Sequence, residues 1–192
     1  RTTHILYEPM SRGRIVRWML EEIGAPYETR ILEYAASMKA PEYLAINPMG
    51  KVPAIVHDGA VVTECAAICA YLADVFPAAG LAPATNSARA DYYRWMFFAA
   101  GPLEAAVTDK SLGVVVPDDK KGFVGYGSLE QVQDALESAL EGKSHIAGDR
   151  FSAADVYVGS HIGWGMQFGT IARRPAFEKY FADLASRPAA IR

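Results

Sequence analysis

The sequence contains little cysteine and no long apolar run. Its two cysteines, Cys65 and Cys69, lie four residues apart in one expected helix, where a disulfide would distort the backbone, so we interpret them as reduced thiols. No apolar run approaches the roughly 20 residues that span a bilayer. The first residues lack the charged start and apolar core of a signal peptide. The sequence therefore predicts a cytoplasmic protein without a membrane segment.

Neither sign of charge predominates in the sequence. The 19 basic and 22 acidic residues leave a formal net charge of −3, and the basic residues are dispersed. This pattern gives no electrostatic footprint for nucleic acid or for an acidic membrane surface. With 51% hydrophobic residues, the chain can bury one large core or two small ones. No metal site is expected, because no metal-ligand spacing links the histidines His4, His57, His145 and His161.

The first part of the chain alternates strand and helix signals. Residues 4–7 form a short β-like run, and apolar residues recur at helical spacing over 15–23 before a glycine and a proline stop the helix. Residues 27–32 are typical of a second strand, and two strands joined through a helix favour a parallel right-handed unit. Asp58-Gly59 predicts a hairpin turn. The expected order is βαβ then ββα, with the later elements at 52–56, 60–62 and 65–76.

Composition changes after the last of these elements. Residues 77–83 are small and show no periodicity, and beyond them strand signals nearly vanish. Residues 87–107 predict a long helix that Gly101-Pro102 kinks or interrupts, because proline removes an intrahelical hydrogen bond. Ser152 stands three residues before Asp155 ahead of an apolar run, which is the capping-box pattern. We therefore predict an α/β domain at 1–77, a linker at 78–86 and an all-helical domain at 87–192.

One motif carries most of the functional information. The stretch Asn47–Pro53 is followed, after a tight turn, by Thr63-Glu64-Cys65 at the start of an apolar helix. The helix start attracts a carboxylate through its unpaired N–H groups and its dipole, and Glu64 suits an ammonium group. A peptide with both α-amino and α-carboxylate ends would fit. These residues resemble the glutathione site of the cytosolic glutathione S-transferase family, and the resemblance spans nearly the whole chain.

The resemblance implies a fold and a binding site. The first domain would be thioredoxin-like, and glutathione would be the co-substrate. Val52-Pro53 resembles the family's cis-proline dipeptide, whose valine pairs with the ligand backbone, while Lys39 and Lys51 could reach the glycine carboxylate or be surface charges. Glu64 and Cys65 would hold the γ-glutamyl end. Cys65 stands where the family usually has serine; it could offer its backbone N–H or be a site of oxidation.

Activation of the thiol is expected in the turn after residues 4–7. A free thiol has a pKa of about 8.5, and lowering it by two units takes roughly 2.7 kcal/mol. Ser11 matches serine-type members of the family, which suggests a bacterial member of serine-type or unassigned class; the alternative is a simple helix cap. Tyr7 would serve in a tyrosine-type member, or pack in its strand. Arg12 could stabilise a thiolate by charge, or be solvated.

The family binds its second, apolar substrate beside this turn. Met10, Tyr93, Phe97, Pro102 and Trp164 are the candidate lining residues, although aromatic residues on long helices more often belong to a core. The resemblance also implies a homodimer and a role in detoxification. We expect a glutathione transferase that acts on an apolar electrophile. The alternatives are a glutathione-dependent isomerase or peroxidase, and a non-catalytic binding or interaction protein.

Overall fold

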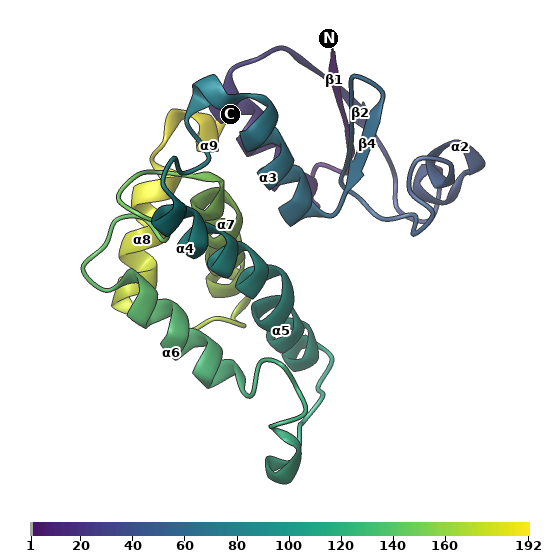
Figure 1. Cartoon of the computed structure of the whole chain (residues 1–192). Helices are drawn as coiled ribbons and strands as arrows, with labels where there is room; N and C mark the ends of the chain where they lie inside the picture. The colour runs from purple at the N-terminus through teal and green to yellow at the C-terminus, as the bar shows by residue number, and fades with distance from the viewer. Residues whose placement is uncertain (1) are drawn as a thin grey trace. The chain divides into compact units, whose positions relative to one another are not determined.

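The computed structural model describes residues 2–192. The chain forms two compact units. One ends at Leu81 and also includes Pro188–Arg192, and the other is Ala82–Arg187. The division falls inside the stretch 78–86, where the sequence predicts a linker and the structure has a short 3₁₀ turn, Pro77–Ala79, at its start. Each unit has its own architecture, an α/β sheet domain and a bundle of helices, as the sequence predicts (Figure 1).

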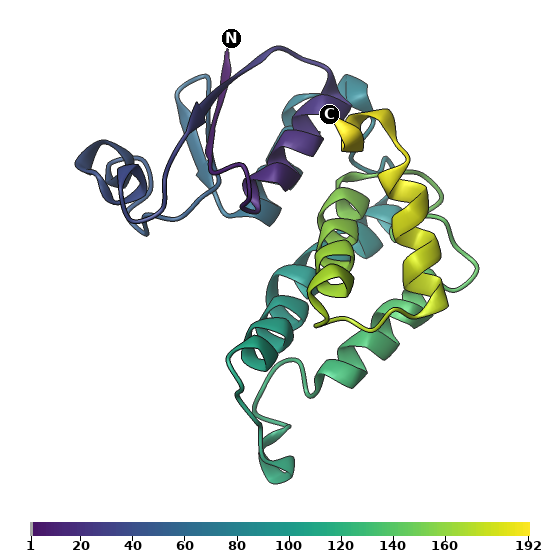
Figure 2. The ribbon, with the colours of Figure 1, turned by 180° about the vertical axis from the view of Figure 1, so that it is seen from behind.

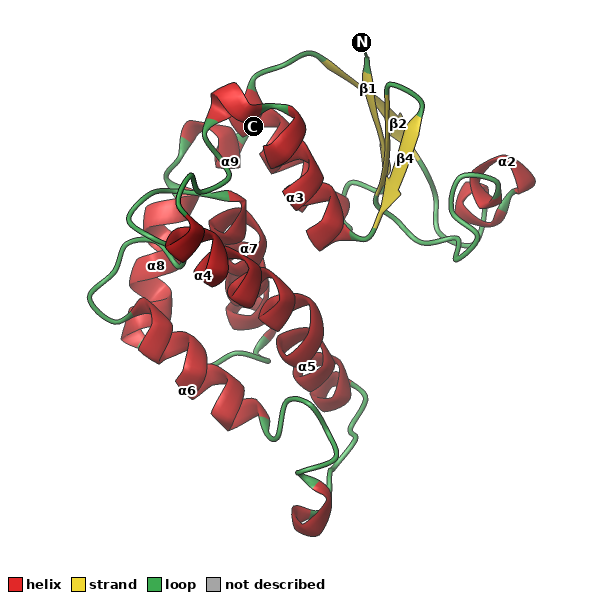
Figure 3. Ribbon diagram, in the orientation of Figure 1, coloured by secondary structure: helices red, strands yellow, loops and turns green. Residues whose placement is uncertain are grey.

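Within residues 2–192, the strands of the first unit form one four-stranded sheet in the order β2-β1-β3-β4 (Figure 3). β1 pairs with β2 in parallel, and β3 pairs with both β1 and β4 in antiparallel register, with Ile5 opposite Ile55. This confirms the βαβ-ββα order. The strands are β1 (Thr3–Tyr7), β2 (Tyr27–Ile31), β3 (Ala54–His57) and β4 (Ala60–Thr63).

One strand begins later than the sequence predicts. Residues 52–56 were expected to be extended, but β3 starts at Ala54. Pro53 has no N–H to donate to a neighbouring strand, so it stands just outside the ladder. The hairpin turn at Asp58-Gly59 is confirmed, with positive φ at both residues, 49° and 78°. Val52 and Pro53 thus form a connection that leads into the inner strand β3.

The helices of the first unit lie on two sides of the sheet. α1 (Gly13–Ile23) and α3 (Cys65–Val75) lie side by side on one face, and the short α2 (Pro41–Leu44) lies on the other (Figures 1 and 2). α1 buries Ile15, Val16, Met19 and Leu20, the expected apolar stripe, and ends at Gly24 in the left-handed conformation. α9 (Pro188–Ile191) packs on α1. On the α2 side, Leu6 and Tyr43 belong to a separate apolar cluster.

The second unit is helical. The predicted interruption at Gly101-Pro102 is confirmed and takes the form of a π-helical turn, Ala99–Leu103, which joins α4 to α5. A π turn accommodates a proline because it loosens the regular hydrogen-bond ladder around the missing N–H. The helices are α4 (Asn86–Phe98), α5 (Glu104–Ser111), α6 (Leu129–Leu140), α7 (Ala153–Phe168) and α8 (Pro175–Ala185), with a 3₁₀ turn at Asp118–Lys120.

α7 forms the centre of the second unit, and its start is the predicted capping box. Asp155 is fully buried and accepts hydrogen bonds from Ser152 N (3.0 Å), Ile146 N (2.9 Å) and Tyr180 Oη (2.6 Å). Burial raises the pKa of the Asp155 carboxyl against the effect of these bonds. Asp155 therefore ties the loop before α7, the start of α7 and α8 together.

Candidate active site

Ser11 holds the turn between β1 and α1. Its hydroxyl donates to the carbonyl of Glu8 at 2.6 Å and accepts from the N–H of Gly13 at 3.0 Å. Only 8% of the residue is exposed. Both bonds stabilise the start of α1, so the capping alternative has direct structural support. A role as donor to sulfur would require the hydroxyl hydrogen to turn away from Glu8.

Tyr7 lies inside the first unit. It is 2% exposed, and its phenol oxygen accepts from Nη1 of Arg17 at 3.3 Å. A Cβ on Gly13 would lie only 2.3 Å from the Cβ of Tyr7, so the first residue of α1 sits directly against this side chain. Hydrogen bonding to Tyr27 and the electrostatic interaction with Tyr7 raise the pKa of Arg17. The phenol is thus engaged with Arg17 along α1, which favours a packed strand tyrosine.

The starts of α1 and α3 are in contact. Cys65 is the first residue of α3, and its thiol donates to the carbonyl of Arg12, which precedes α1, at 3.7 Å. The first N–H groups of both helices have no intrahelical acceptor, so two positive helix ends lie side by side. Met10, 78% exposed, lies in the same turn. This arrangement gives an anion or a thiolate two helix N-termini to interact with.

Glu64 has an unusual backbone. Its φ of 75° and ψ of 116° lie outside the regions that a non-glycine residue favours. Such conformations cost of order 1–3 kcal/mol and cluster at ligand sites. The side chain is exposed at the N-terminal end of α3. The backbone of Glu64 is thus consistent with a binding role.

The two thiols differ in environment. The hydrogen bond with Cys65 and complete burial raise the pKa of the Cys69 thiol well above its usual value. Cys65 is partly exposed, and neither cysteine is in a disulfide. Cys69 is therefore a neutral, buried thiol that is hydrogen-bonded to Cys65.

The stretch 47–53 is organised by residues that the sequence analysis did not assign to the site. Asn47, 3% exposed, donates from Nδ2 to the carbonyl of Lys51 at 2.9 Å and accepts from Met49 N at 3.1 Å. Tyr43 Oη also donates to the carbonyl of Lys51. The Val52–Pro53 peptide bond is cis, as the resemblance implies. Asn47 and Tyr43 position this dipeptide; the available signal was the asparagine that opens the motif.

Lys39 lies beside this stretch and Lys51 within it. Nζ of Lys39 donates to the carbonyl of Gly50 at 2.9 Å. Gly50 has a φ of 60°, a backbone conformation that favours glycine, and a Cβ there would lie 2.9 Å from that Nζ, which would have to shift. Lys51 is exposed. The structure thus anchors one lysine to the motif and leaves the other at its surface.

The candidates for the second substrate are divided between the units. Met10 belongs to the first, and Tyr93, Phe97, Pro102 and Trp164 belong to the second. On α4, Tyr93 accepts a hydrogen bond from Nη2 of Arg89 at 2.7 Å, and Phe97 is 72% exposed. Trp164 on α7 is half-buried. The shared apolar pocket stays a prediction.

Comparison with known proteins places this chain in a family. A model of the glutathione S-transferase N-terminal domain matches residues 10–75, and a model of the C-terminal domain matches residues 127–188. A curated relative from Xanthomonas campestris, glutathione S-transferase GST-4.5, is 30% identical over 166 residues, which are 81% of this chain and 76% of that protein. The chain belongs to the glutathione S-transferase family. Its thioredoxin-like first unit and helical second unit are the family's fold.

Two further similarities stand beside these, of which the first supports the assignment to the glutathione S-transferase family. The solved structure of a sphingomonad glutathione S-transferase in complex with glutathione is 31% identical, with a TM-score of 0.78 over 97% of this chain and 94% of that one. Protein LigF of Sphingobium is 56% identical over 52 residues, which are 26% of this chain and 20% of that protein. The similarity to the sphingomonad enzyme covers both units.

Two further features concern the helices and the metal-ligating side chains of residues 2–192. None of the helices within residues 2–192 combines the length and apolar character that a membrane crossing needs. In the same part of the chain, no group of three or more His, Cys, Asp or Glu side chains is placed to hold a metal ion.

Proposed function

We propose that this protein is a glutathione transferase, which binds glutathione on the first unit and activates its thiol to attack an apolar electrophile. The observation that carries the proposal is the contact between Cys65 and the carbonyl of Arg12. This contact sets the N-terminus of α3 next to the first turn of α1. One helix end can thus bind a ligand carboxylate while the other lies near the ligand thiol.

The remaining ligand contacts follow from the motif. The backbone of Val52 pairs with the cysteinyl unit of glutathione, and Pro53 fixes the direction of that backbone. Glu64 binds the α-ammonium group, and the N–H groups at Cys65 bind the α-carboxylate. Lys39 donates one N–H to Gly50, which leaves further N–H groups for the glycine carboxylate; Lys51 stands beside it.

We propose that Ser11 and the N-terminus of α1, assisted by the charge of Arg12, stabilise the thiolate of glutathione. The hydroxyl of Ser11 must exchange its bond to Glu8 for one to sulfur. A charge-assisted bond to a thiolate is stronger than a bond to a neutral carbonyl, so the exchange is favourable once the thiol ionises. Tyr7 is a weaker candidate because its phenol is engaged with Arg17.

The test separates binding from activation. Calorimetric titration with glutathione should give a dissociation constant that Ser11→Ala barely changes, while the ultraviolet titration of the bound thiol should show a raised pKa and conjugation of a model electrophile should slow. Ser138→Ala, an exposed serine on α6, is the matched control. An unaltered thiol pKa in Ser11→Ala, with loss of activity in Tyr7→Phe, would transfer the role to Tyr7.

A second candidate is a non-catalytic member of the family that binds glutathione or a partner. The observation that favours it is that the hydroxyl of Ser11 and the phenol of Tyr7 both have partners within the protein. Glutathione binding without conjugation, isomerisation or peroxide reduction would support it. Isomerase and peroxidase activities use the same first site, so assays with all three substrate classes distinguish the enzymatic alternatives.

Four wider properties belong to the proposal. The second substrate is an apolar electrophile bound by Met10 together with Tyr93, Phe97, Pro102 and Trp164. The protein is a homodimer, which light scattering can measure. Its location in the cytoplasm and a role in detoxification stay predictions that cell fractionation and a gene deletion under electrophile stress can check.

A further inference from the structure

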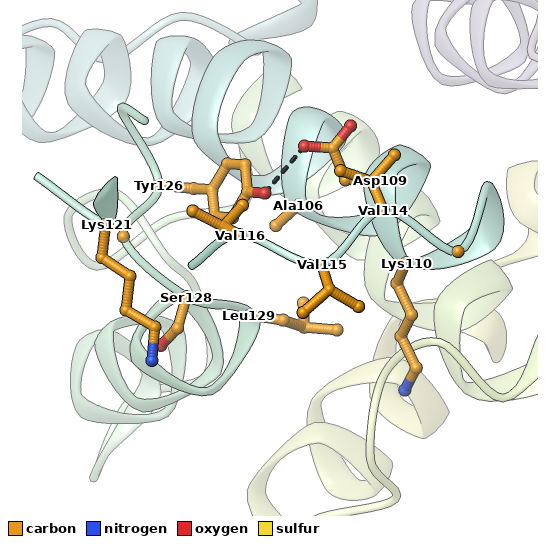
Figure 4. Close-up of a pocket in the computed structure, with 12 residues that line it drawn as sticks. Ala106, Asp109, Lys110, Val114, Val115, Val116, Lys121, Tyr126, Ser128 and Leu129 are labelled. Carbon is orange, nitrogen blue, oxygen red and sulfur yellow. Dashed lines mark hydrogen bonds between the residues drawn. The ribbon is translucent and has the colours of Figure 1, made fainter. Parts of the chain in front are cut away.

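The connection between α5 and α6 lines an open cavity that the proposed function does not use. The cavity measures about 360 Å³ and lies entirely within the second unit (Figure 4). Its walls come from the last turns of α5, from residues 113–116 and from the return of the chain through Tyr126 to Leu129. Volumes of this order hold small organic molecules.

Asp109 fixes the shape of this cavity. Its carbonyl accepts from Val114 N at 2.9 Å, and its side chain accepts from Tyr126 Oη at 2.7 Å. Hydrogen bonding to Asp109 raises the pKa of the Tyr126 phenol, which therefore keeps its proton. Asp109 thus links Val114 and Tyr126, which lie on the two segments that line the cavity, to the end of α5. These hydrogen bonds hold the shape of the cavity.

The walls are mostly apolar. Val114 is 50% exposed and Val115 is 86% exposed, while Ala106 is buried. Leu129, at the start of α6, is half-buried beside them. Exposed valines next to each other cost hydration free energy that a flat apolar ligand would recover. The walls therefore favour an aromatic or compact aliphatic body.

Positive charge flanks the cavity on one side. Lys110 and Lys121 extend away from the Asp109–Tyr126 pair, one on either side of Leu129 and Ser128 (Figure 4). Lys121 pairs with Asp118 at 2.9 Å, but Asp118 is 95% exposed, so this pair can open at little cost. A second cavity of about 420 Å³ adjoins the first and shares Lys121 and Ser128 with it.

We propose that this cavity binds a small aryl carboxylate, with the ring against the valines and Leu129 and the carboxylate at the end of the cavity where Lys121 and Ser128 lie. The acidic side chain of Asp109 does not oppose this, because it is bonded to Tyr126 and lies on the far side of the cavity. The site is separate from the residues proposed to bind glutathione. It would add a ligand-binding function to the helical unit.

The experiment uses the full chain saturated with glutathione. 2-Naphthoate is titrated while amide NMR shifts are followed, with neutral 2-naphthylmethanol and cationic 2-naphthylmethylammonium as matched probes. The amides of Gly113, Val116 and Gly127 should shift with 2-naphthoate, and the cationic probe should leave them unchanged. If 2-naphthoate shifts none of these three amides, the proposal is wrong.

Variants test the two halves of the site. Lys121→Glu should weaken 2-naphthoate binding at these amides by about fivefold, and Lys110→Glu should weaken it less. Lys120→Glu, on the same loop but outside the lining, should not weaken it. Val114→Asp should weaken binding of both 2-naphthoate and 2-naphthylmethanol. All four positions are exposed, so the fold should survive, as thermal unfolding can verify. Equal binding of 2-naphthoate to both lysine variants and the wild type would overturn the carboxylate assignment.

Discussion

Replacing Asp155 by alanine would leave three buried donors without their acceptor. These are the N–H groups of Ile146 and Ser152 and the phenol of Tyr180, at 2.9, 3.0 and 2.6 Å from the carboxylate. Each unsatisfied donor costs about 1–3 kcal/mol. The removal of a buried charge and the entry of water offset part of this free-energy cost. We therefore expect Asp155→Ala to lower the free energy of unfolding by about 3–5 kcal/mol.

The measurement is urea unfolding, followed by tryptophan fluorescence and circular dichroism. Asp183→Ala is the matched control, because Asp183 lies on the surface of α8 and pairs with exposed Lys179 at 3.2 Å. That surface pair should contribute less than about 1 kcal/mol. A loss below about 1 kcal/mol in Asp155→Ala would show that the three donors find other partners, and it would refute the role assigned to this carboxylate.

The pH dependence has a defined sign. Because burial raises the pKa of Asp155, the folded state binds this proton more tightly than the unfolded state does. Its contribution to stability is therefore fully present below the usual carboxyl pKa and decreases as pH rises toward the folded value. Asp155→Asn does not titrate, so the stability lost on this substitution should be larger at pH 4 than at pH 7.

Three substitutions in the first unit give further predictions. Gly13→Ala should destabilise the protein by about 1–3 kcal/mol in thermal unfolding, because the new methyl group would meet Tyr7. Lys39→Met should weaken glutathione binding in calorimetry by about tenfold, through loss of a charge and of the bond to Gly50; unchanged affinity would remove Lys39 from the site. Glu64→Gly should leave stability unchanged or higher, since glycine adopts this φ freely, while glutathione affinity falls.

The fold could largely be predicted from the sequence because its signals are local. The stripe from Ile15 to Leu20, the turn at Asp58-Gly59 and the capping box at Ser152 each lie within a few residues of the structure they specify. The start of β3 was predicted too early because valine and proline both fit an extended chain. Only the pairing with β1 shows that Pro53 stands outside the ladder.

The candidate site was harder to predict, because its geometry depends on contacts distant in sequence. The sequence shows a serine after β1 but not that its hydroxyl is bonded to Glu8. It shows Tyr7 but not that the phenol is engaged with Arg17. The contact between Cys65 and Arg12 arises when α3 packs on α1, and no local pattern encodes it.

The packing of α9 on α1 has a consequence for how the protein is made. The first unit is discontinuous in sequence, since Pro188–Arg192 completes it after the whole of Ala82–Arg187 has intervened. During synthesis from the N-terminus, α1 therefore remains partly uncovered until the helical unit has left the ribosome. Any fragment that stops near Leu81 lacks this cover, so the first unit produced by itself would leave part of α1 exposed.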